Sequence, residues 1–284
     1  MKALGEAQVT VVGLGLMGGS LAGALRGRCR AIVGVGRRAD TIQIAQDRGL
    51  VDRGTTDLAA GLRQADIVVL ATPVRAILRL LAEIGPLLPE GCLVMDLGST
   101  KTQIVARMAE LPSHLQPLGG HPLCGREVTG IAAADPALYR GRTFVLSPLP
   151  RTSEAAFALG CALVEATGAH PLVLDPERHD RLVAVSSHLP YLLACGLAGT
   201  AAAKAGADPA LWAVAASGFG DTSRLAGSDV TMMLDILLTN REAVLAAVQV
   251  CQAQLRKLAG TLEAGDEEGL RAVLTAIRGR RPEA

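Results

Sequence analysis

Two of the five histidines lie in settings where an imidazole could do chemistry. His121 stands in "LGGHPLCGRE", which we interpret as a rigid loop because it has neither a helical nor a strand period. His188 stands in "VSSHLPYLL", where Pro190 disturbs a helical pattern. A lone histidine is more often structural than catalytic. A neutral imidazole can nevertheless accept a proton near neutral pH, so both are candidates for acid–base work.

The elements that would position this chemistry begin with "VTVVGLGLMGGSLAGAL". Gly13, Gly15 and Gly18 fit the Gly-x-Gly-x-x-Gly pattern between a β-branched strand and a helix, which is the context of a dinucleotide-binding turn. Gly13 would form the tight turn, Gly15 would admit the pyrophosphate and Gly18 would let helix and strand pack closely. The helix N-terminus at Leu16 and Met17 would offer its unpaired N–H groups to the phosphates.

The kind of dinucleotide depends on the end of the second strand, about 20 residues further on, where a carboxylate would bind the ribose of NAD. The sequence there is "VGVGRRADT", with Arg37, Arg38 and nearby Thr41 but no acid in the expected position. Guanidinium groups pair well with a 2′-phosphate, so the sequence predicts NADP over NAD. The alternative is that both arginines belong to a solvated turn.

Two further segments end predicted strands and should line the nicotinamide side of the site. One is "ATPV", with Ala71, Thr72 and Pro73, and the other is "DLGSTK", with Ser99. In open α/β sheets, ligands bind beyond the carboxyl ends of the strands.

Strand-like and helix-like segments alternate over residues 1–175, which predicts a Rossmann-type α/β domain with a doubly wound, mainly parallel sheet. The predicted strands are "QVTVVGLG", "AIVGVGR", "ADIVVLATP", "CLVMDLGS", "RTFVLSP" and "HPLVLD". Residues 176–284 form an all-helical dimerisation domain in this interpretation, with helices at about 177–206, 208–217, 229–237, 240–263 and 266–278. Asp208 and Asn240 are the predicted N-caps of the second and fourth of these helices.

Composition limits the possible partners. Hydrophobic residues make up 50% of the chain and aromatic ones 2%, so the core must consist of Ala, Leu, Val and Ile, and the extensive apolar helical surface favours a homodimer. With 28 basic and 27 acidic residues, the chain has no global field for nucleic acid or a membrane surface. The apolar stretch from Leu182 to Ala203 is predicted to be a buried helix pair and not a membrane span. Six single cysteines without metal-ligand spacing predict no metal, and with no signal sequence we expect a cytoplasmic protein.

Taken together, "GLGLMGGSLA", "ATPV", "DLGSTK", "GGHPLCGRE", "HDRLVAVSSHLPYLLA" and "GFGDTSR" resemble, in this order, the prephenate and arogenate dehydrogenases of tyrosine biosynthesis. The resemblance covers nearly the whole chain. It implies an oxidative decarboxylation in which hydride passes to the nicotinamide and carbon dioxide leaves. The arginine after the second strand is more similar to the NADP-dependent arogenate enzymes than to the NAD-dependent prephenate enzymes.

The resemblance also implies roles for individual residues, in an active site between the two domains. His121 matches the catalytic histidine that takes the proton of the ring hydroxyl, and Ser99 matches a serine that bonds near it. Arg224 matches the arginine that pairs with a substrate carboxylate, with Asp221 orienting it, and His188 matches a second substrate-facing histidine. The alternatives are that Ser99 caps the following helix, that Arg224 is an interface ion-pair partner and that His188 is a buried helix histidine.

The chain departs from the family pattern at Gly220, Arg126, Met233 and Leu234, all of which would border the substrate pocket and affect substrate choice. Prephenate dehydrogenase activity therefore stays open beside arogenate dehydrogenase activity. A related two-domain hydroxyacid dehydrogenase or imine reductase would need a helical-domain lysine, for which only Lys204 and Lys257 are present. A catalytically silent NADP-sensing protein is the alternative from another class.

Overall fold

The computed structural model describes residues 1–126 and 128–280. Its N-terminal half is built on one eight-stranded sheet in the order β3-β2-β1-β4-β5-β6-β7-β8. Every neighbouring pair runs parallel except β6 and β7, which are antiparallel. The predicted mainly parallel, doubly wound sheet is thus confirmed. The strands are β1 Gln8–Val12, β2 Ala31–Val35, β3 Arg53–Thr55, β4 Ile67–Leu70, β5 Leu93–Asp96, β6 Gln116–Pro122, β7 Thr143–Pro148 and β8 His170–Val173.

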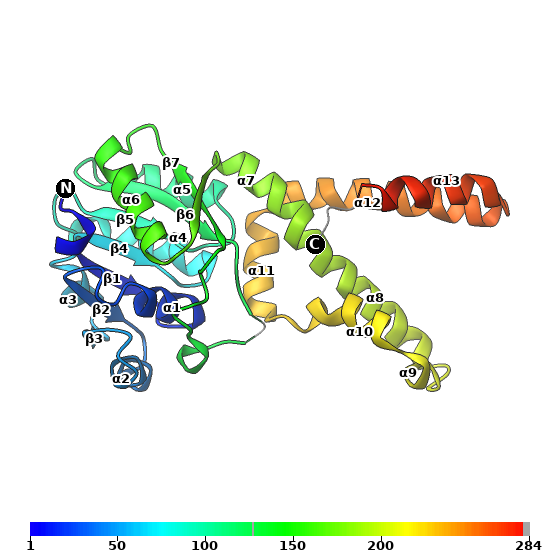
Figure 1. Ribbon diagram of the computed structural model, residues 1–284, viewed down its shortest axis with the longest axis horizontal. Coiled ribbons are helices and arrows are strands. Elements are labelled where there is room, and N and C mark those ends of the chain that lie inside the picture. The colour runs from blue at the N-terminus through cyan, green and yellow to red at the C-terminus, as the bar shows by residue number, and fades with distance from the viewer. Residues whose placement is uncertain (127, 281–284) are drawn as a thin grey trace.

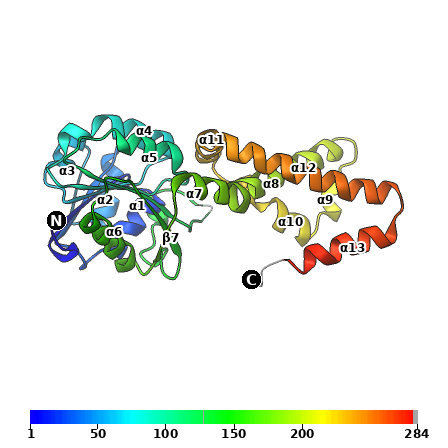
Figure 2. The same ribbon diagram turned by 90° about the horizontal axis from the view of Figure 1, so that it is seen from above.

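Helices cover both faces of this sheet (Figures 1 and 2). Helices α1 (Leu16–Ala24), α2 (Ala39–Asp47) and α6 (Glu154–Ala166) enclose one apolar core with the sheet. Helices α3 (Leu58–Leu62), α4 (Val74–Glu83) and α5 (Thr102–Ala109) enclose the other. Because both faces are covered, the central strands β1, β4 and β5 are buried along their whole length. Short 3₁₀ turns lie at Leu4–Glu6, Gly85–Leu87 and Ile131–Ala133.

Two strands escaped sequence analysis, and one of them corrects the placement of His121. The histidine lies in β6 and not in a loop, directly opposite Val145 of β7. Glycines and prolines hide the strand pattern because the backbone there has no room for side chains. A Cβ added to Gly120 would lie 2.5 Å from the carbonyl oxygen of Asp96. The other missed strand, β3, has only three residues at the sheet edge.

The C-terminal half is helical, as predicted, and projects away from the sheet (Figure 1). One continuous helical run consists of α7 (Pro176–Val183), a π-helical turn (Ala184–His188) and α8 (Leu189–Ala205). The remaining elements are α9 (Leu211–Val214), α10 (Ser217–Ser223), the 3₁₀ turn η5 (Arg224–Gly227), α11 (Val230–Thr239), α12 (Arg241–Glu263) and α13 (Glu267–Arg278).

Two details of the predicted helical half are wrong. The helix predicted at 208–217 begins only at Leu211 and ends at Val214, so Asp208 precedes it and accepts a bond from the Ala210 N–H instead of capping it. The stretch 182–203 is part of one helical run and not a buried helix pair. The capping position of Asn240 before α12 is correct, but its side chain does not cap that helix.

The run from Pro176 to Ala205 is long and apolar enough to cross a membrane by length and composition alone, and only 22% of its most apolar stretch is buried in the single chain. Its first turns nevertheless pack against α5, and its π-helical turn packs against α12. These are the contacts of a helix within a folded protein.

Candidate active site

The glycine-rich turn between β1 and α1 has the shape of a pyrophosphate cradle. Gly13 has a φ of +103°, which a side chain would make strained, and a Cβ on Gly18 would collide with the carbonyl oxygen of Gly13. At Gly15, the N-cap of α1, an added Cβ would meet no atom within 4 Å. Two glycines are thus required by the protein's own packing, whereas the third leaves open space in front of a helix N-terminus.

Thr72 gives a second sign that a ligand belongs beside this turn. Its Oγ1 atom is buried and has no hydrogen-bond partner among the described residues. A Cβ on Gly13 would lie 2.8 Å from the Thr72 methyl group, so the threonine adjoins the turn. An unsatisfied buried hydroxyl is costly unless a ligand satisfies it, so the residues present fit a dinucleotide.

The end of β2 carries the two predicted arginines, both exposed. Arg38 is already engaged, because its Nε lies 3.2 Å from Asp40 and it donates to the Thr41 hydroxyl at 3.2 and 3.3 Å. Arg37 is the second residue after the end of β2, following Gly36. The two guanidinium groups are therefore not equivalent, and Arg37 is the better candidate for a 2′-phosphate.

His121 is held by the contact of its strand with β5. The N–H of Gly120, the preceding residue, donates to Asp96 at 2.9 Å, and the N–H of Gly98 donates to the same carboxylate at 2.7 Å. The Lys101 ammonium pairs with Asp96, and both side chains are fully buried. Asp96 therefore joins the carboxyl end of β5 to the strand that carries the histidine, and Lys101 balances its buried charge.

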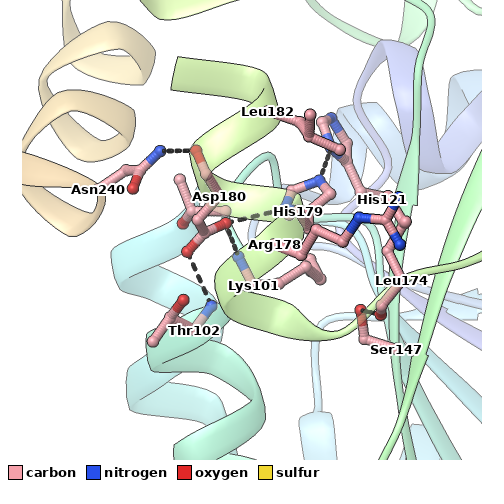
Figure 3. A network of polar contacts seen from close by, with 12 residues as sticks. Lys101, Thr102, His121, Ser147, Leu174, Arg178, His179, Asp180, Leu182 and Asn240 are labelled. Carbon is pink, nitrogen blue, oxygen red and sulfur yellow. Dashed lines mark hydrogen bonds and ion pairs between the residues drawn. The ribbon is translucent and has the colours of Figure 1, made fainter. Parts of the chain in front are cut away.

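The side chain of His121 belongs to a hydrogen-bonded chain that reaches the helical half (Figure 3). Its Nδ1 lies 2.8 Å from Nε2 of His179, and Nδ1 of His179 lies 2.8 Å from Asp180. The Asp180 carboxylate also accepts the backbone N–H groups of Lys101 at 2.7 Å and Thr102 at 2.9 Å. This series of hydrogen bonds therefore runs from β6 through α7 to the start of α5.

Asp180 accepts hydrogen bonds from the first backbone N–H groups of α5. This finding corrects an expectation about Ser99. The alternative role for Ser99, capping that helix, is wrong, because Lys101 occupies the cap position and Asp180 from α7 accepts the first N–H groups. Ser99 itself lies half-buried in the turn between β5 and α5, next to Gly98.

Electrostatics keep this group of side chains in defined protonation states. Burial lowers the pKa of His121 well below its usual value, and the neighbouring His179, Lys101 and His188 add to the effect. Burial alone would raise the pKa of Asp180, but hydrogen bonds from His179, Thr102 and Lys101 outweigh it and the pKa is lowered. At neutral pH the site thus holds a neutral His121 and an ionised Asp180.

His188 joins the same group from the π-helical turn. Asn240 donates to the backbone carbonyl of Asp180 at 2.7 Å, and its amide nitrogen lies 3.2 Å from Nδ1 of His188. His188 is 1% exposed, and burial lowers its pKa to about 4, although the Asp180 carboxylate acts in the opposite direction. This burial favours the structural alternative for His188 over direct contact with a substrate.

The other predicted substrate residues come from a different segment. Arg224 begins η5 and Asp221 lies in α10, and both elements pack against α8. Lys204 and Lys257, the lysines considered for a hydroxyacid dehydrogenase, are exposed on α8 and α12. In residues 1–126 and 128–280, no three His, Cys, Asp or Glu side chains are grouped so that they could hold a metal ion.

The partners of His121 were not among the residues predicted from the sequence. His179 and Asp180 stand in the segment "HDRLVAVSSHLPYLLA" but were given no role, and Asn240 was noted only as a helix cap. Adjacent histidine and aspartate residues at a helix start were the available signal. The buried pair of Asp96 and Lys101 lies within "DLGSTK", where only Ser99 was singled out.

The fold and the site together define a class of protein. The protein combines a Rossmann-type domain, which carries a dinucleotide cradle, with a helical domain. A buried series of hydrogen-bonded imidazole side chains connects the two. This is the architecture of a two-domain oxidoreductase. A glycine-rich turn at a helix N-terminus and a neutral imidazole at the carboxyl edge of the sheet are the parts that hydride transfer with proton removal requires.

Comparison with known proteins makes this assignment specific. Residues 21–173 match the prephenate dehydrogenase nucleotide-binding domain, and residues 175–276 match the prephenate dehydrogenase dimerization domain. A prephenate dehydrogenase of Bacillus subtilis is 32% identical over 266 residues, which cover 92% of this chain and 72% of the relative. The chain belongs to the prephenate dehydrogenase family, and it is an oxidoreductase with a nicotinamide dinucleotide cofactor.

Two solved structures agree with this placement. The prephenate dehydrogenase of Aquifex aeolicus, in complex with hydroxyphenyl propionate and NAD⁺, superposes with a TM-score of 0.91 at 32% identity and covers 99% of both chains. The arogenate dehydrogenase of Synechocystis superposes with a TM-score of 0.83 at 33% identity and covers 96% of this chain and 98% of its own. The resemblance derived from the sequence motifs is therefore confirmed at the level of the family.

Proposed function

We propose that this protein catalyses the NADP-dependent oxidative decarboxylation of arogenate to tyrosine. The observation that carries the proposal is the position of His121. It is a neutral imidazole at the carboxyl edge of the sheet, held there by hydrogen bonds that run through His179 to Asp180. A base in that state can accept a proton without first losing one.

In the proposed reaction, His121 accepts the proton of the ring hydroxyl as that carbon loses a hydride. The nicotinamide, when bound, supplies the acceptor for this hydride. The bond between the ring and its carboxylate then breaks, carbon dioxide leaves, and the electron pair stays in the ring, which becomes aromatic. Ser99 would hydrogen-bond near the hydroxyl, and Arg224 would bind a substrate carboxylate while Asp221 would orient it.

For the cofactor, we propose that Gly13, Gly15 and Gly18 form the pyrophosphate cradle, with the first N–H groups of α1 at Leu16 and Met17. Thr72, flanked by Ala71 and Pro73, would use its unsatisfied hydroxyl toward the same ligand. Arg37 would pair with the 2′-phosphate, while Arg38 and Thr41 would shape that side of the pocket. This arrangement supports NADP over NAD.

We also propose that the protein works as a homodimer through its helical half. The buried apolar cluster of that half is small, centred on Ala184, Val244 and Ala247. Large apolar side chains are exposed along its helices, among them Trp212 at 51%, Val214 at 78% and Leu262 at 65%. An apolar surface of this kind is costly in water and is typical of a subunit interface.

A second candidate function is the same reaction on prephenate, in which a keto group replaces the amino group of arogenate. The prephenate dehydrogenases of Bacillus subtilis and Aquifex aeolicus favour it, as the Synechocystis arogenate dehydrogenase favours the first. The chemistry at His121 would be identical in both cases. Only the residues around the substrate side chain would differ.

The test is a two-by-two assay of each substrate with NADP and with NAD, following reduced nicotinamide by absorbance. We expect the highest kcat/KM with arogenate and NADP. No turnover of either substrate would refute the dehydrogenase proposal. Replacement His121→Asn should lower kcat by about 10²–10⁴-fold and leave cofactor affinity unchanged, whereas a silent NADP-sensing protein would bind cofactor without any turnover before or after the replacement.

A further inference from the structure

We propose that His179 and Asp180 are positioning residues that hold His121 in a single tautomer, with the proton on Nδ1 and a bare Nε2 facing the substrate. The inference deepens the proposed function and rests on His121 acting as its base. It concerns two side chains of α7, of which His179 contacts His121 directly and Asp180 contacts His179 (Figure 3).

The hydrogen-bond donors to the Asp180 carboxylate are defined by the fold. Its carboxylate accepts the backbone N–H groups of Lys101 at 2.7 Å and Thr102 at 2.9 Å. Both donors belong to the start of α5, where the positive end of the helix dipole favours a negative charge. An ionised carboxylate can only accept, so the Nδ1 atom of His179, 2.8 Å away, must carry a proton.

The other ring nitrogen of His179, Nε2, faces His121. The ring is fully buried. A neutral imidazole with a proton on Nδ1 has a lone pair on Nε2. His121 Nδ1 lies 2.8 Å from that atom, so it must donate, and Nε2 of His121 is left free to accept.

The surrounding charges are consistent with this assignment. The Lys101 ammonium and the Asp96 carboxylate pair with each other below the site. His188 faces Asn240, whose amide donates to the Asp180 backbone carbonyl, so it does not compete for the carboxylate. Asp180 is thus the acceptor at the end of the chain, and its charge stabilises the imidazolium that forms once His121 takes up a proton.

The hydrogen-bonded chain also links His121, the proposed base, to the packing of the helical half against the sheet domain. His121 belongs to the sheet domain, whereas His179 and Asp180 belong to the first helix of the helical half. Asp180 in turn binds α5 of the sheet domain. The base therefore has its defined tautomer only while α7 is docked against α5.

A matched pair of replacements separates positioning from packing. In His179→Gln the side-chain amide reaches the place of Nε2 and can still accept from His121, whereas in His179→Asn it reaches only the place of Nδ1. We expect His179→Gln to stay within a few fold of the parent kcat and His179→Asn to lose about 10–100-fold, with the KM for NADP unchanged in both. Equal losses in the two variants at equal thermal stability would overturn the inference.

Imidazole ¹⁵N NMR of the parent protein without substrate gives a readout that does not depend on activity. We expect His121 to show protonated Nδ1 and unprotonated Nε2, and His179→Asn to show a mixture of the two tautomers. A proton on Nε2 of His121, or a doubly protonated His179, would reverse the donor and acceptor roles of the two histidines and refute the inference. If the expected tautomer is found but neither substrate is turned over, the proposed function fails and the hydrogen-bonded assignment stands.

Discussion

Lys101 and Asp96 form an ion pair with both side chains fully buried, at the end of β5, the strand that pairs with the His121 strand β6. Burial raises the pKa of Asp96 and lowers that of Lys101, while their mutual attraction opposes both effects. The carboxylate is further satisfied by the N–H groups of Gly98 and Gly120. The pair therefore links the β5–α5 turn to β6.

Breaking this pair should be strongly destabilising. We expect Lys101→Met to lower the free energy of unfolding by about 3–5 kcal/mol, because it leaves a buried carboxylate without its cation. Urea denaturation measures the loss. The matched control is Lys204→Met on the exposed surface of α8, which should change stability by less than about 0.5 kcal/mol. Similar small losses in both variants would show that Asp96 does not depend on the pair.

The glycines of the cofactor turn should separate folding from ligand binding. Gly18→Ala places a Cβ against the Gly13 carbonyl and should destabilise the protein by about 1–3 kcal/mol. Gly15→Ala places a Cβ in open space and should leave stability nearly unchanged while weakening cofactor binding by at least about tenfold. Thermal unfolding and a cofactor titration on both variants provide the measurement. An unchanged cofactor affinity in Gly15→Ala would place the pyrophosphate elsewhere.

The two arginines after β2 offer an internal comparison for cofactor choice. Arg37→Ala should raise the KM for NADP by about 10–100-fold and leave the KM for NAD unchanged, since it removes a charge-assisted bond to the 2′-phosphate. Arg38→Ala should have a smaller effect, because Arg38 is engaged with Asp40 and Thr41. Steady-state kinetics with both cofactors measure these KM values in each variant. An unchanged KM for NADP in Arg37→Ala would favour the solvated-turn interpretation.

Buried His188 should make stability depend on pH. Its pKa is lowered to about 4 in the folded state, against about 6.5 in an unfolded chain. The unfolded state therefore binds more protons between these values, and stability should fall as the pH decreases from about 6.5 to 4, by up to about 3 kcal/mol from this residue. His188→Gln should flatten that part of the profile in denaturant unfolding at several pH values. An unchanged slope would mean that His188 does not titrate in this range.

Much of the fold and part of the site were predictable because their signals are local. Continuous apolar runs and helical periods identified six of the eight strands and the order of the two halves. The spacing of Gly13, Gly15 and Gly18 identified the cofactor turn, because the turn needs all three within six residues. Gly13 has a positive φ, a Cβ on Gly18 would collide with the Gly13 carbonyl, and Gly15 leaves open space before α1. β6 was hidden because a Cβ on Gly120 would collide with the backbone of β5 and one on Gly119 would collide with Val105 of α5, and no local pattern reveals such distant neighbours.

The sequence by itself determined the class of cofactor, the mainly parallel sheet, the helical second half and the identity of the candidate base. Only the tertiary structure decided what His121 contacts, how α5 is capped and what Asn240 does. His179 lies 58 positions from His121, and Asn240 lies 60 positions from Asp180. Hydrogen bonds over such separations form only when whole elements dock, because a side chain's partner is then set by the packing of α7 and α12 and not by its own neighbours along the chain.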